Sequence, residues 1–242
     1  MRVIPAIDLY ESHVVRFERG DKKRIHLYDL DPVELLELFV REGFELVHVV
    51  DLSCAIDGST ANESVLKKIS LMHLAKFVQI GGGIRSAERA IWLRQMGFRR
   101  QILSSALIED PTLICEILKQ DIQVVFSLDT YGEQVRLKGW KETSDLNVLE
   151  LLKNLKELGL KEVIHTDTEA DGTLKGRRLD FTKRLAVQTG LTFIVAGGIS
   201  NVEDLDNVRK LSLEVPNVSG VIVGRAFYEG KITLKEMKSY AR

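Results

Sequence analysis

The sequence is poor in cysteine and contains no long apolar run. Its two cysteines, Cys54 and Cys115, are far apart and lie in apolar surroundings. Their spacing excludes a disulfide framework and a paired-cysteine zinc site, so we expect two buried free thiols. No apolar stretch approaches the ~20 residues that a membrane-spanning helix requires. The sequence therefore predicts a protein that neither spans a membrane nor depends on disulfides.

An excess of charge of one sign is also absent. The chain has 34 Lys and Arg against 35 Asp and Glu, which gives a formal net charge of −1. This balance does not favour nucleic acid or an anionic membrane as a partner, so any anion must be recognised locally. The N-terminal residues reach Asp8 before the apolar core of a signal peptide could form. We expect a cytoplasmic protein that acts on a small molecule, and a monomer, with an oligomer left open.

What the sequence has throughout is an alternation of short β-branched runs with longer amphipathic stretches. This pattern is typical of strand–helix units around a parallel sheet. Barrels built from eight such units usually occupy about 250 residues as one domain. The sequence predicts an α/β protein with a single (β/α)8 TIM barrel over residues 1–242. The predicted strands are 3–8, 46–51, 77–81, 101–105, 123–129, 162–166, 192–196 and 220–224.

Helix boundary signals support these units. Residues 32–42 form an amphipathic pattern in which Asp31 caps the first turn, Pro32 suits the first helical position and Gly43 suits the exit. Asp110 and Pro111 predict the start of a later helix in the same way.

The second half of the sequence repeats the first. Four segments match in the same order, each about half of the chain apart, and the first match places Asp129 opposite Asp8. Such an order at a nearly constant offset predicts two half-barrels, 1–121 and 122–242, rather than a short-period solenoid. The matched segments are 3–9 with 124–130, 46–51 with 163–168, 79–84 with 195–199 and 102–106 with 222–226.

Glycine-rich segments follow the third and seventh predicted strands. Glycine after a buried strand lets the backbone approach an anion, and amides at the next helix N-terminus hold it. One such segment is more often a tight turn, but two related by the repeat predict a ligand with phosphate at both ends. The arginines could instead be solvated surface residues. The predicted phosphate ligands are Gly81, Gly82, Gly83, Arg85, Ser104 and Ser105 in the first half, and Gly197, Gly198, Gly224 and Arg225 in the second.

Two aspartates end the first and fifth predicted strands, at the rim from which catalytic groups project in such barrels. Asp8 and Asp129 would face each other there, and their interaction would push their ionisations apart, which suits an acid and a base. The alternative is that each caps the next helix. Asp51 and Asp167 are interpreted as groups that order loops. The histidines, including His48 within a strand, are interpreted as structural.

Together the motifs resemble the phosphoribosylformimino-5-aminoimidazole carboxamide ribotide isomerase family of histidine biosynthesis, over the whole chain. No single motif is decisive, but their order is specific. The motifs are Pro5-Ala6-Ile7-Asp8-Leu9, Gly81-Gly82-Gly83-Ile84-Arg85, Ser127-Leu128-Asp129, Lys138-Gly139-Trp140, Asp171-Gly172-Thr173 and Gly197-Gly198-Ile199.

The resemblance implies an Amadori rearrangement of an aminoaldose to an aminoketose, on a bisphosphorylated substrate and without a metal or an organic cofactor. By the family's pattern, Asp8 is the general base, Asp129 is the general acid, and Thr166 supports the chemistry by hydrogen bonding. Arg16 matches a loop position that contacts substrate, and Trp140 matches one that stacks on an aromatic base. The family motif formed by Asp171, Gly172 and Thr173 implies further substrate contacts.

Three loops depart from the family's pattern. The segment from Tyr10 to Arg16 lacks the common Gly-Lys, Tyr131 stands where arginine is frequent, and residues 167–171 differ from the usual Asp-Ile-Ser. These changes leave the reaction class intact but bear on efficiency and loop closure.

Three alternatives stay open. The related imidazole glycerol phosphate synthase cyclase would have Cys before its first Asp and a loop lysine, where this chain has Ala6 and Arg16. A phosphoribosylanthranilate isomerase, alone or as a second activity, needs the same rearrangement, but two phosphate sites argue against it as the sole function. A non-catalytic barrel that binds a phosphorylated metabolite is the alternative from another class.

Overall fold

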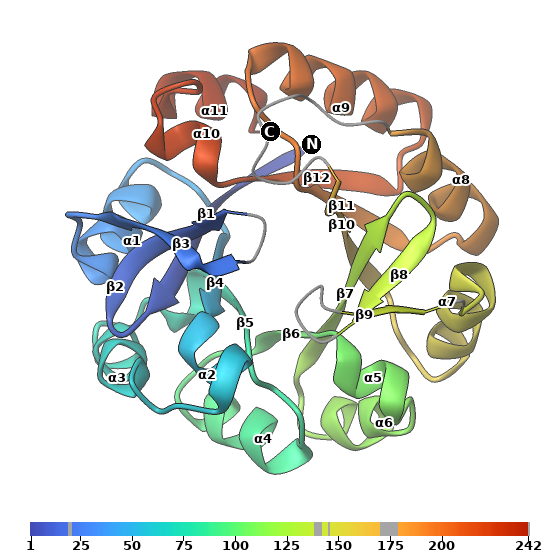
Figure 1. The fold of residues 1–242 in the computed structure, drawn as a ribbon, viewed down its shortest axis with the longest axis horizontal. Helices are drawn as coiled ribbons and strands as arrows, with labels where there is room; N and C mark the ends of the chain where they lie inside the picture. Colours follow the sequence, from blue (N-terminus) through green and yellow to red (C-terminus); the bar gives the residue numbers. More distant parts are fainter. Residues whose placement is uncertain (19–20, 138–141, 145, 170–178, 242) are drawn as a thin grey trace. The chain divides into compact units, whose positions relative to one another are not determined.

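The computed structural model describes residues 1–241 except 19–20, 138–141, 145 and 170–178. All eight predicted strands are present, in hydrogen-bonded order β10-β11-β12-β1-β4-β5-β6-β7, and β10 also pairs with β7 (Figure 1). The ladder of parallel strands therefore closes on itself, which confirms the (β/α)8 fold class. The eight strands are β1 (Arg2–Tyr10), β4 (Val47–Asp51), β5 (Val78–Gly81), β6 (Arg100–Leu103), β7 (Gln123–Tyr131), β10 (Glu162–Asp167), β11 (Thr192–Ala196) and β12 (Val218–Val223).

Helices connect these strands along the chain. They are α1 (Pro32–Arg41), α2 (Leu52–Asp57), α3 (Glu63–Leu71), η1 (Ala75–Phe77), α4 (Ala87–Gln95), α5 (Ser105–Glu109), α6 (Leu113–Leu118), α7 (Val148–Glu157), α8 (Asp180–Thr189), α9 (Val202–Glu214), α10 (Arg225–Tyr228) and α11 (Leu234–Tyr240). No helix among the described residues has both the length and the apolar character to cross a bilayer.

One helix boundary prediction is confirmed and another is wrong. Asp31 caps α1, because its carboxylate accepts hydrogen bonds from the amides of Val33 and Glu34. Asp110 does not open α6, which begins at Leu113. Its Oδ1 instead accepts hydrogen bonds from the amide and hydroxyl of Thr112, in the turn that separates α5 from α6. An aspartate before proline predicts such a turn as readily as a helix start.

Two antiparallel extensions lie where the sequence predicts loops. β2 (His13–Glu18) folds back on β1 and pairs with β3 (Asp21–Tyr28). In the same way, β8 (Gln134–Leu137) folds back on β7 and pairs with β9 (Glu142–Ser144). Each extension lengthens a strand that carries one of the candidate carboxylates.

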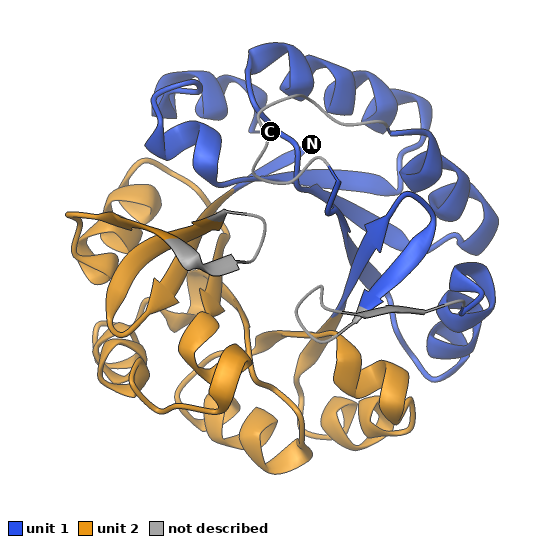
Figure 2. Ribbon diagram, in the orientation of Figure 1, with its two compact units in different colours: residues 1–4, 126–242 blue, residues 5–125 orange. Residues whose placement is uncertain are grey.

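The chain forms two compact units (Figure 2). Unit 2 comprises residues 5–125, and unit 1 comprises residues 1–4 and 126–242. β1 and β7 contribute residues to both. Within each unit, the main strands are buried on both faces and read as nearly continuous apolar runs, as expected for parallel strands covered by helices.

Helix packing within unit 2 illustrates the core. Leu36 and Phe39 of α1 are fully buried, and the Phe39 ring meets that of Phe44 edge-on with centroids 6.0 Å apart. Burying one such side chain stabilises the fold by about 1.5–3 kcal/mol. Of the two cysteines expected to be buried, Cys54 is buried, but Cys115 is half-buried because its helix turns it partly outward. Neither cysteine forms a disulfide bond.

Candidate active site

Asp8 lies near the end of β1, between the buried side chains of Ile7 and Leu9. Its register partners are Val50 of β4 and Val15 of β2. The Arg16 guanidinium, on β2, donates a hydrogen bond from Nη1 to Asp8 Oδ2 at 2.8 Å. The structure therefore places the predicted base and the predicted loop arginine in one ion pair, which is mostly shielded from solvent.

The first glycine segment packs under the junction of β4 and α2. Gly82 and Gly83 have φ values of 101° and 69°. A Cβ on Gly82 would lie 2.2 Å from the Asp51 carbonyl oxygen, and one on Gly83 would lie 2.2 Å from Cys54 Sγ. Close packing thus requires glycine at both positions, whatever these residues bind. It also holds their backbone rigidly in place.

Asp51 is the anchor of this junction. The side chain is fully buried, and its Oδ1 accepts hydrogen bonds from the Cys54 amide and from Asn62 Nδ2. Burial raises the pKa of the Asp51 carboxyl, while these hydrogen bonds and Arg89 act in the opposite direction. Asp51 thus orders the loop that follows β4, as interpreted from the sequence.

The remaining predicted ligands of unit 2 flank the glycines. Arg85 precedes α4 rather than lying within it, and its Nη2 donates to the Ala55 carbonyl at 2.6 Å. Ser86 caps α4. Ser104 is the N-cap residue of α5 but its side chain makes no capping hydrogen bond, and Ser105 is the first residue of that helix.

His48 belongs to a polar row across three strands of unit 2. Its Nδ1 bonds Gln79 Nε2 at 3.0 Å, and Gln79 Oε1 accepts from Arg100 Nε at 2.9 Å. Burial lowers the pKa of His48 to about 3, with further lowering by the charges of Arg16 and Arg100. His48 is therefore neutral and structural at neutral pH.

Replacing His48 with glutamine should flatten the acid limb of the stability curve. Unfolded His48 titrates near 6.5, so between pH 6.5 and about 3 the unfolded chain binds a proton that the folded chain does not. The unfolding free energy should therefore fall as the pH falls through this window, by about 1 kcal/mol per pH unit for this group, and the effect vanishes above pH 6.5. Urea unfolding of wild type and His48→Gln measures the difference. Exposed His26→Gln is the control, and equal slopes for wild type and His48→Gln would contradict the assignment.

In unit 1, Asp129 occupies the corresponding place on β7, between buried Leu128 and Thr130. Ser127 Oγ donates a hydrogen bond to Asp129 Oδ1 at 3.3 Å. Thr166, half-buried, lies near the end of β10, and its register partner Ala196 directly precedes the second glycine segment.

His165, next to Thr166, is a structural residue as interpreted. It is buried and bonds the hydroxyls of Thr130 and Thr182 at 3.0 and 2.8 Å.

The second glycine segment ends β11 of the same unit. Gly197 and Gly198 have φ values of 75° and 72°. The next helix, α9, is capped by its own side chains, because Asn201 Oδ1 accepts from the Asp204 amide and the Asp204 carboxylate accepts from the Asn201 amide. In contrast, Gly224, as the N-cap residue of α10, brings no side chain to the first turn of that helix. Arg225 lies in α10 and its Nε bonds the Glu229 carboxylate.

Tyr131, which follows the candidate acid on β7, lies beside a guanidinium from another residue. Arg136 of β8 lies over the Tyr131 ring, 5.1 Å from its centroid. Strand β8 therefore brings a positive charge to the extension that follows Asp129. Four further predictions, Trp140, Asp171, Gly172 and Thr173, lie outside the described residues.

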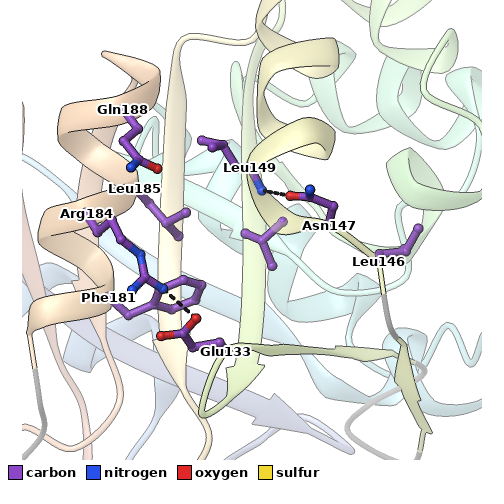
Figure 3. Close-up of a pocket in the computed structure, with 9 residues that line it drawn as sticks. Glu133, Leu146, Asn147, Leu149, Phe181, Arg184, Leu185 and Gln188 are labelled. Carbon is purple, nitrogen blue, oxygen red and sulfur yellow. Dashed lines mark hydrogen bonds and ion pairs between the residues drawn. The ribbon is translucent and has the colours of Figure 1, made fainter.

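A cavity of about 290 Å³ in unit 1 is separate from the predicted residues (Figure 3). Figure 3 shows Arg184 reaching from α8 to the Glu133 carboxylate at the tip of the β7–β8 turn. The two side chains form an ion pair in which Arg184 Nη2 lies 2.5 Å from Glu133 Oε2. None of the predicted site residues lines this cavity, so it is not the candidate active site. Its walls are Glu133, Leu146, Asn147, Val148, Leu149, Phe181, Arg184, Leu185 and Gln188.

Within each unit, the structure thus brings the predicted residues to corresponding strand ends. Sequence reasoning missed the polar residues that hold the turn after β1, namely Asn62 and Ser53, both fully buried. Buried polar side chains need partners, but the sequence contains no signal that these two would be buried. No group of three or more His, Cys, Asp or Glu side chains in the described part of the chain is arranged to hold a metal ion.

Comparison with known proteins gives one family. A family model described as "Histidine biosynthesis protein" matches residues 2–233. Three relatives share the name 1-(5-phosphoribosyl)-5-((5-phosphoribosylamino)methylideneamino) imidazole-4-carboxamide isomerase. The protein of Carboxydothermus hydrogenoformans is 40% identical over 98% of this chain and 96% of its own length. That of Synechocystis sp. is 38% identical over 98% and 91%, and that of Acidiphilium cryptum is 37% identical over 96% and 94%.

Proposed function

We propose, because the chain belongs to the histidine biosynthesis protein family, that it catalyses an Amadori rearrangement. The substrate is the aminoaldose indicated by the names of its relatives, and the product is the corresponding aminoketose. The family expected from the sequence motifs is thereby confirmed. The observation that carries the proposal is the pattern within each unit: an aspartate near the end of the first strand and a glycine turn after the third. The names of the relatives supply the substrate.

The chemistry needs one acid and one base. We assign the acid to Asp129, which protonates the ring oxygen as the C1–O bond breaks and the nitrogen lone pair forms a C1=N bond. Asp8 is the base that removes the proton from C2. The electrons of that C–H bond form the C1=C2 bond of an enaminol as the C1=N π electrons return to the nitrogen. Tautomerisation then places a carbonyl at C2 and a proton on C1. Thr166 supports this chemistry by hydrogen bonding.

In the free protein, Arg16 holds the carboxylate of Asp8 in place. Its guanidinium hydrogen-bonds the carboxylate at 2.8 Å. With Oδ2 held in this way, we assign the removal of the C2 proton to the other carboxylate oxygen, Oδ1, and Arg16 is placed to contact the substrate beside it. Charge-assisted hydrogen bonds of this kind are strong and directional, so the pair also fixes the orientation of the carboxylate.

We assign the two phosphates of the substrate to the two glycine turns. The donors would be the amides of Gly82 and Gly83 with the start of α5, and those of Gly197 and Gly198 with the start of α10. This assignment is supported by the capping pattern, because α4 and α9 are capped by their own side chains whereas α5 and α10 are not. Uncapped first-turn amides are suited to an anion.

We also propose that the units descend from one duplicated half-barrel, with halves 1–121 and 122–242. The compact units, 5–125 and 126–242 with 1–4, support this division.

A three-substrate assay tests the function. The purified protein is incubated with the aminoaldose, with phosphoribosylanthranilate, and with the cyclase substrate plus ammonia, and each reaction is followed by absorbance. We expect turnover of the aminoaldose. Turnover of phosphoribosylanthranilate as well would show a bifunctional isomerase. Turnover of phosphoribosylanthranilate or the cyclase substrate without the aminoaldose, or no turnover at all, would contradict the proposal.

A further inference from the structure

We propose that Asn62, assisted by Ser53, is a positioning residue that holds the turn between β1 and β2 and thereby sets Arg16 against Asp8. This inference rests on the proposed function, because it takes Asp8 and Arg16 as members of the reacting site. Neither Asn62 nor Ser53 needs to touch the substrate in this role.

The turn that they hold is under conformational strain. Tyr10 and His13 are the last paired residues of the hairpin, so Glu11 and Ser12 form a two-residue loop. Both have positive φ, 48° and 66°. Positive φ at both central positions is the signature of a type I′ turn, which strongly favours Asn-Gly. Glutamate and serine have no such preference, so this sequence needs outside support to keep the turn closed.

That support comes from the segment that follows β4. The Ser12 amide donates to Asn62 Oδ1 at 2.7 Å, and the Glu11 amide donates to Ser53 Oγ at 2.9 Å. Ser12 Oγ also donates to the Ala61 carbonyl at 2.9 Å. Both amides of the turn are therefore bonded to side chains that are fully buried.

Asn62 in turn is fixed by two further bonds. Its Nδ2 donates to the Leu9 carbonyl at 3.1 Å and to Asp51 Oδ1 at 2.6 Å. The side chain thus needs one acceptor and two donors at once, and among side chains of this size the carboxamide provides that set. Aspartate would lose both donors and place a second carboxylate beside Asp51.

The hydrogen bonding of Asn62 at the start of α3 also supports its role in holding the turn between β1 and β2. Asn62 is the N-cap residue of α3, where asparagine usually accepts a hydrogen bond from the first turn. Here its side chain makes no capping bond and is turned toward β1 instead. The Asn62 side chain therefore stabilises the turn between β1 and β2 instead of the first turn of α3.

The consequence for Arg16 follows from strand register. The loop sets the register in which Leu9 pairs with Val14 and Asp8 with Val15, and Arg16 is the next residue of β2. In a strand, a slip of one residue moves every side chain to the other face. Releasing the turn would therefore weaken the 2.8 Å contact between Arg16 and Asp8 without removing either residue.

Kinetics of Asn62→Ala, Arg16→Ala and the double variant test the proposal with the aminoaldose as substrate. We expect Asn62→Ala to lower kcat by about tenfold, in the range that small misplacements of catalytic groups produce. In the Arg16→Ala background, Asn62→Ala should lower kcat by less than about twofold. The reason is that Asn62 affects the reaction through the position of Arg16, which is already removed in that background. Asn217→Ala is the matched control, since that side chain donates to two carbonyls of unit 1, Ala186 and Leu191. It should lower the melting temperature and leave kcat unchanged.

A rescue experiment separates turn geometry from general stability. Adding Glu11→Asn with Ser12→Gly to Asn62→Ala supplies the residues that a type I′ turn prefers and should restore most of the lost kcat. Ser53→Ala removes the single acceptor of the Glu11 amide and should lower kcat about threefold, because it also loosens the turn. This variant replaces Asn62→Ala in the test if Asn62→Ala does not fold. Full kcat in Asn62→Ala or in Ser53→Ala, or additive effects with Arg16→Ala, would overturn the inference. Inactive wild type would contradict the proposed function instead.

Discussion

Asp8→Asn and Asp129→Asn are each expected to lower kcat with the aminoaldose by about 10²-fold or more. A positioned acid or base contributes about 10²–10⁴-fold, and asparagine keeps the shape of the side chain while removing its ability to exchange a proton. Asp8→Asn should leave the strands intact, because the β1–β2 and β1–β4 ladders are formed by the backbone. Steady-state kinetics on both variants, with melting temperatures to verify folding, measure the effect.

The matched control for these variants is Asp121→Asn. Asp121 lies between α6 and β7, where its carboxylate pairs with Arg94 and Arg99, and it is no part of the strand ends that carry the candidate site. Its replacement should leave kcat unchanged. A near-normal kcat for Asp8→Asn or for Asp129→Asn would remove that residue from the mechanism.

Gly82→Ala is expected to destabilise the protein by about 3 kcal/mol or more. Two costs combine, since alanine is disfavoured at a φ of 101° and its Cβ would lie 2.2 Å from the Asp51 carbonyl oxygen. For a protein of this size the loss corresponds to a fall of roughly 6–12 °C in melting temperature. Calorimetry or circular dichroism of the variant measures it.

Gly58→Ala separates the two costs. Gly58 ends α2 with a φ of 76°, and a Cβ there would meet nothing within 4 Å. Its replacement should cost about 1–2 kcal/mol, from the left-handed conformation without a clash. If Gly82→Ala and Gly58→Ala lowered the free energy of unfolding equally, the clash of a Cβ at position 82 with Asp51 would not contribute to the destabilisation.

The rigid packing of this glycine turn bears on the anion site proposed there. If glycine were needed solely for a phosphate to approach, the backbone could relax around a Cβ in the free protein. Because Gly82 and Gly83 are held against Asp51 and Cys54, their amides are already fixed before a ligand binds. Fixed donors lower the ordering cost of binding an anion. A structural and a binding role are therefore compatible at the same residues.

The parallel strands could be predicted from the sequence because each is a short, nearly continuous apolar run followed by a turn or a helix signal. The hairpins after β1 and β7 could not be distinguished from loops in the same way. The turn of the first hairpin has Glu11 and Ser12 where a sequence signal would be Asn-Gly. Its geometry depends on Asn62, which lies 50 residues further along the chain. Contacts of that kind are tertiary, and local patterns do not contain them.

In the candidate site, too, some residues could be predicted from the sequence while their supporting contacts could not. Asp8, Asp129 and the glycine turns could be proposed from spacing and from the internal repeat. The partners that orient these groups, such as Arg16 for Asp8 and Ser127 for Asp129, became evident from the coordinates. The units also differ in how they hold the backbone after the candidate aspartate: Asn62 donates to the Leu9 carbonyl in unit 2, and Thr168 donates to the Thr130 carbonyl in unit 1. A repeat in sequence therefore does not predict the same supporting contacts.

The most direct test of the central claim is a crystal structure of the protein soaked with inorganic phosphate. We expect two bound phosphates, one at Gly82, Gly83 and the start of α5, and the other at Gly197, Gly198 and the start of α10. A single phosphate site would contradict the proposed binding of one substrate phosphate at each glycine turn.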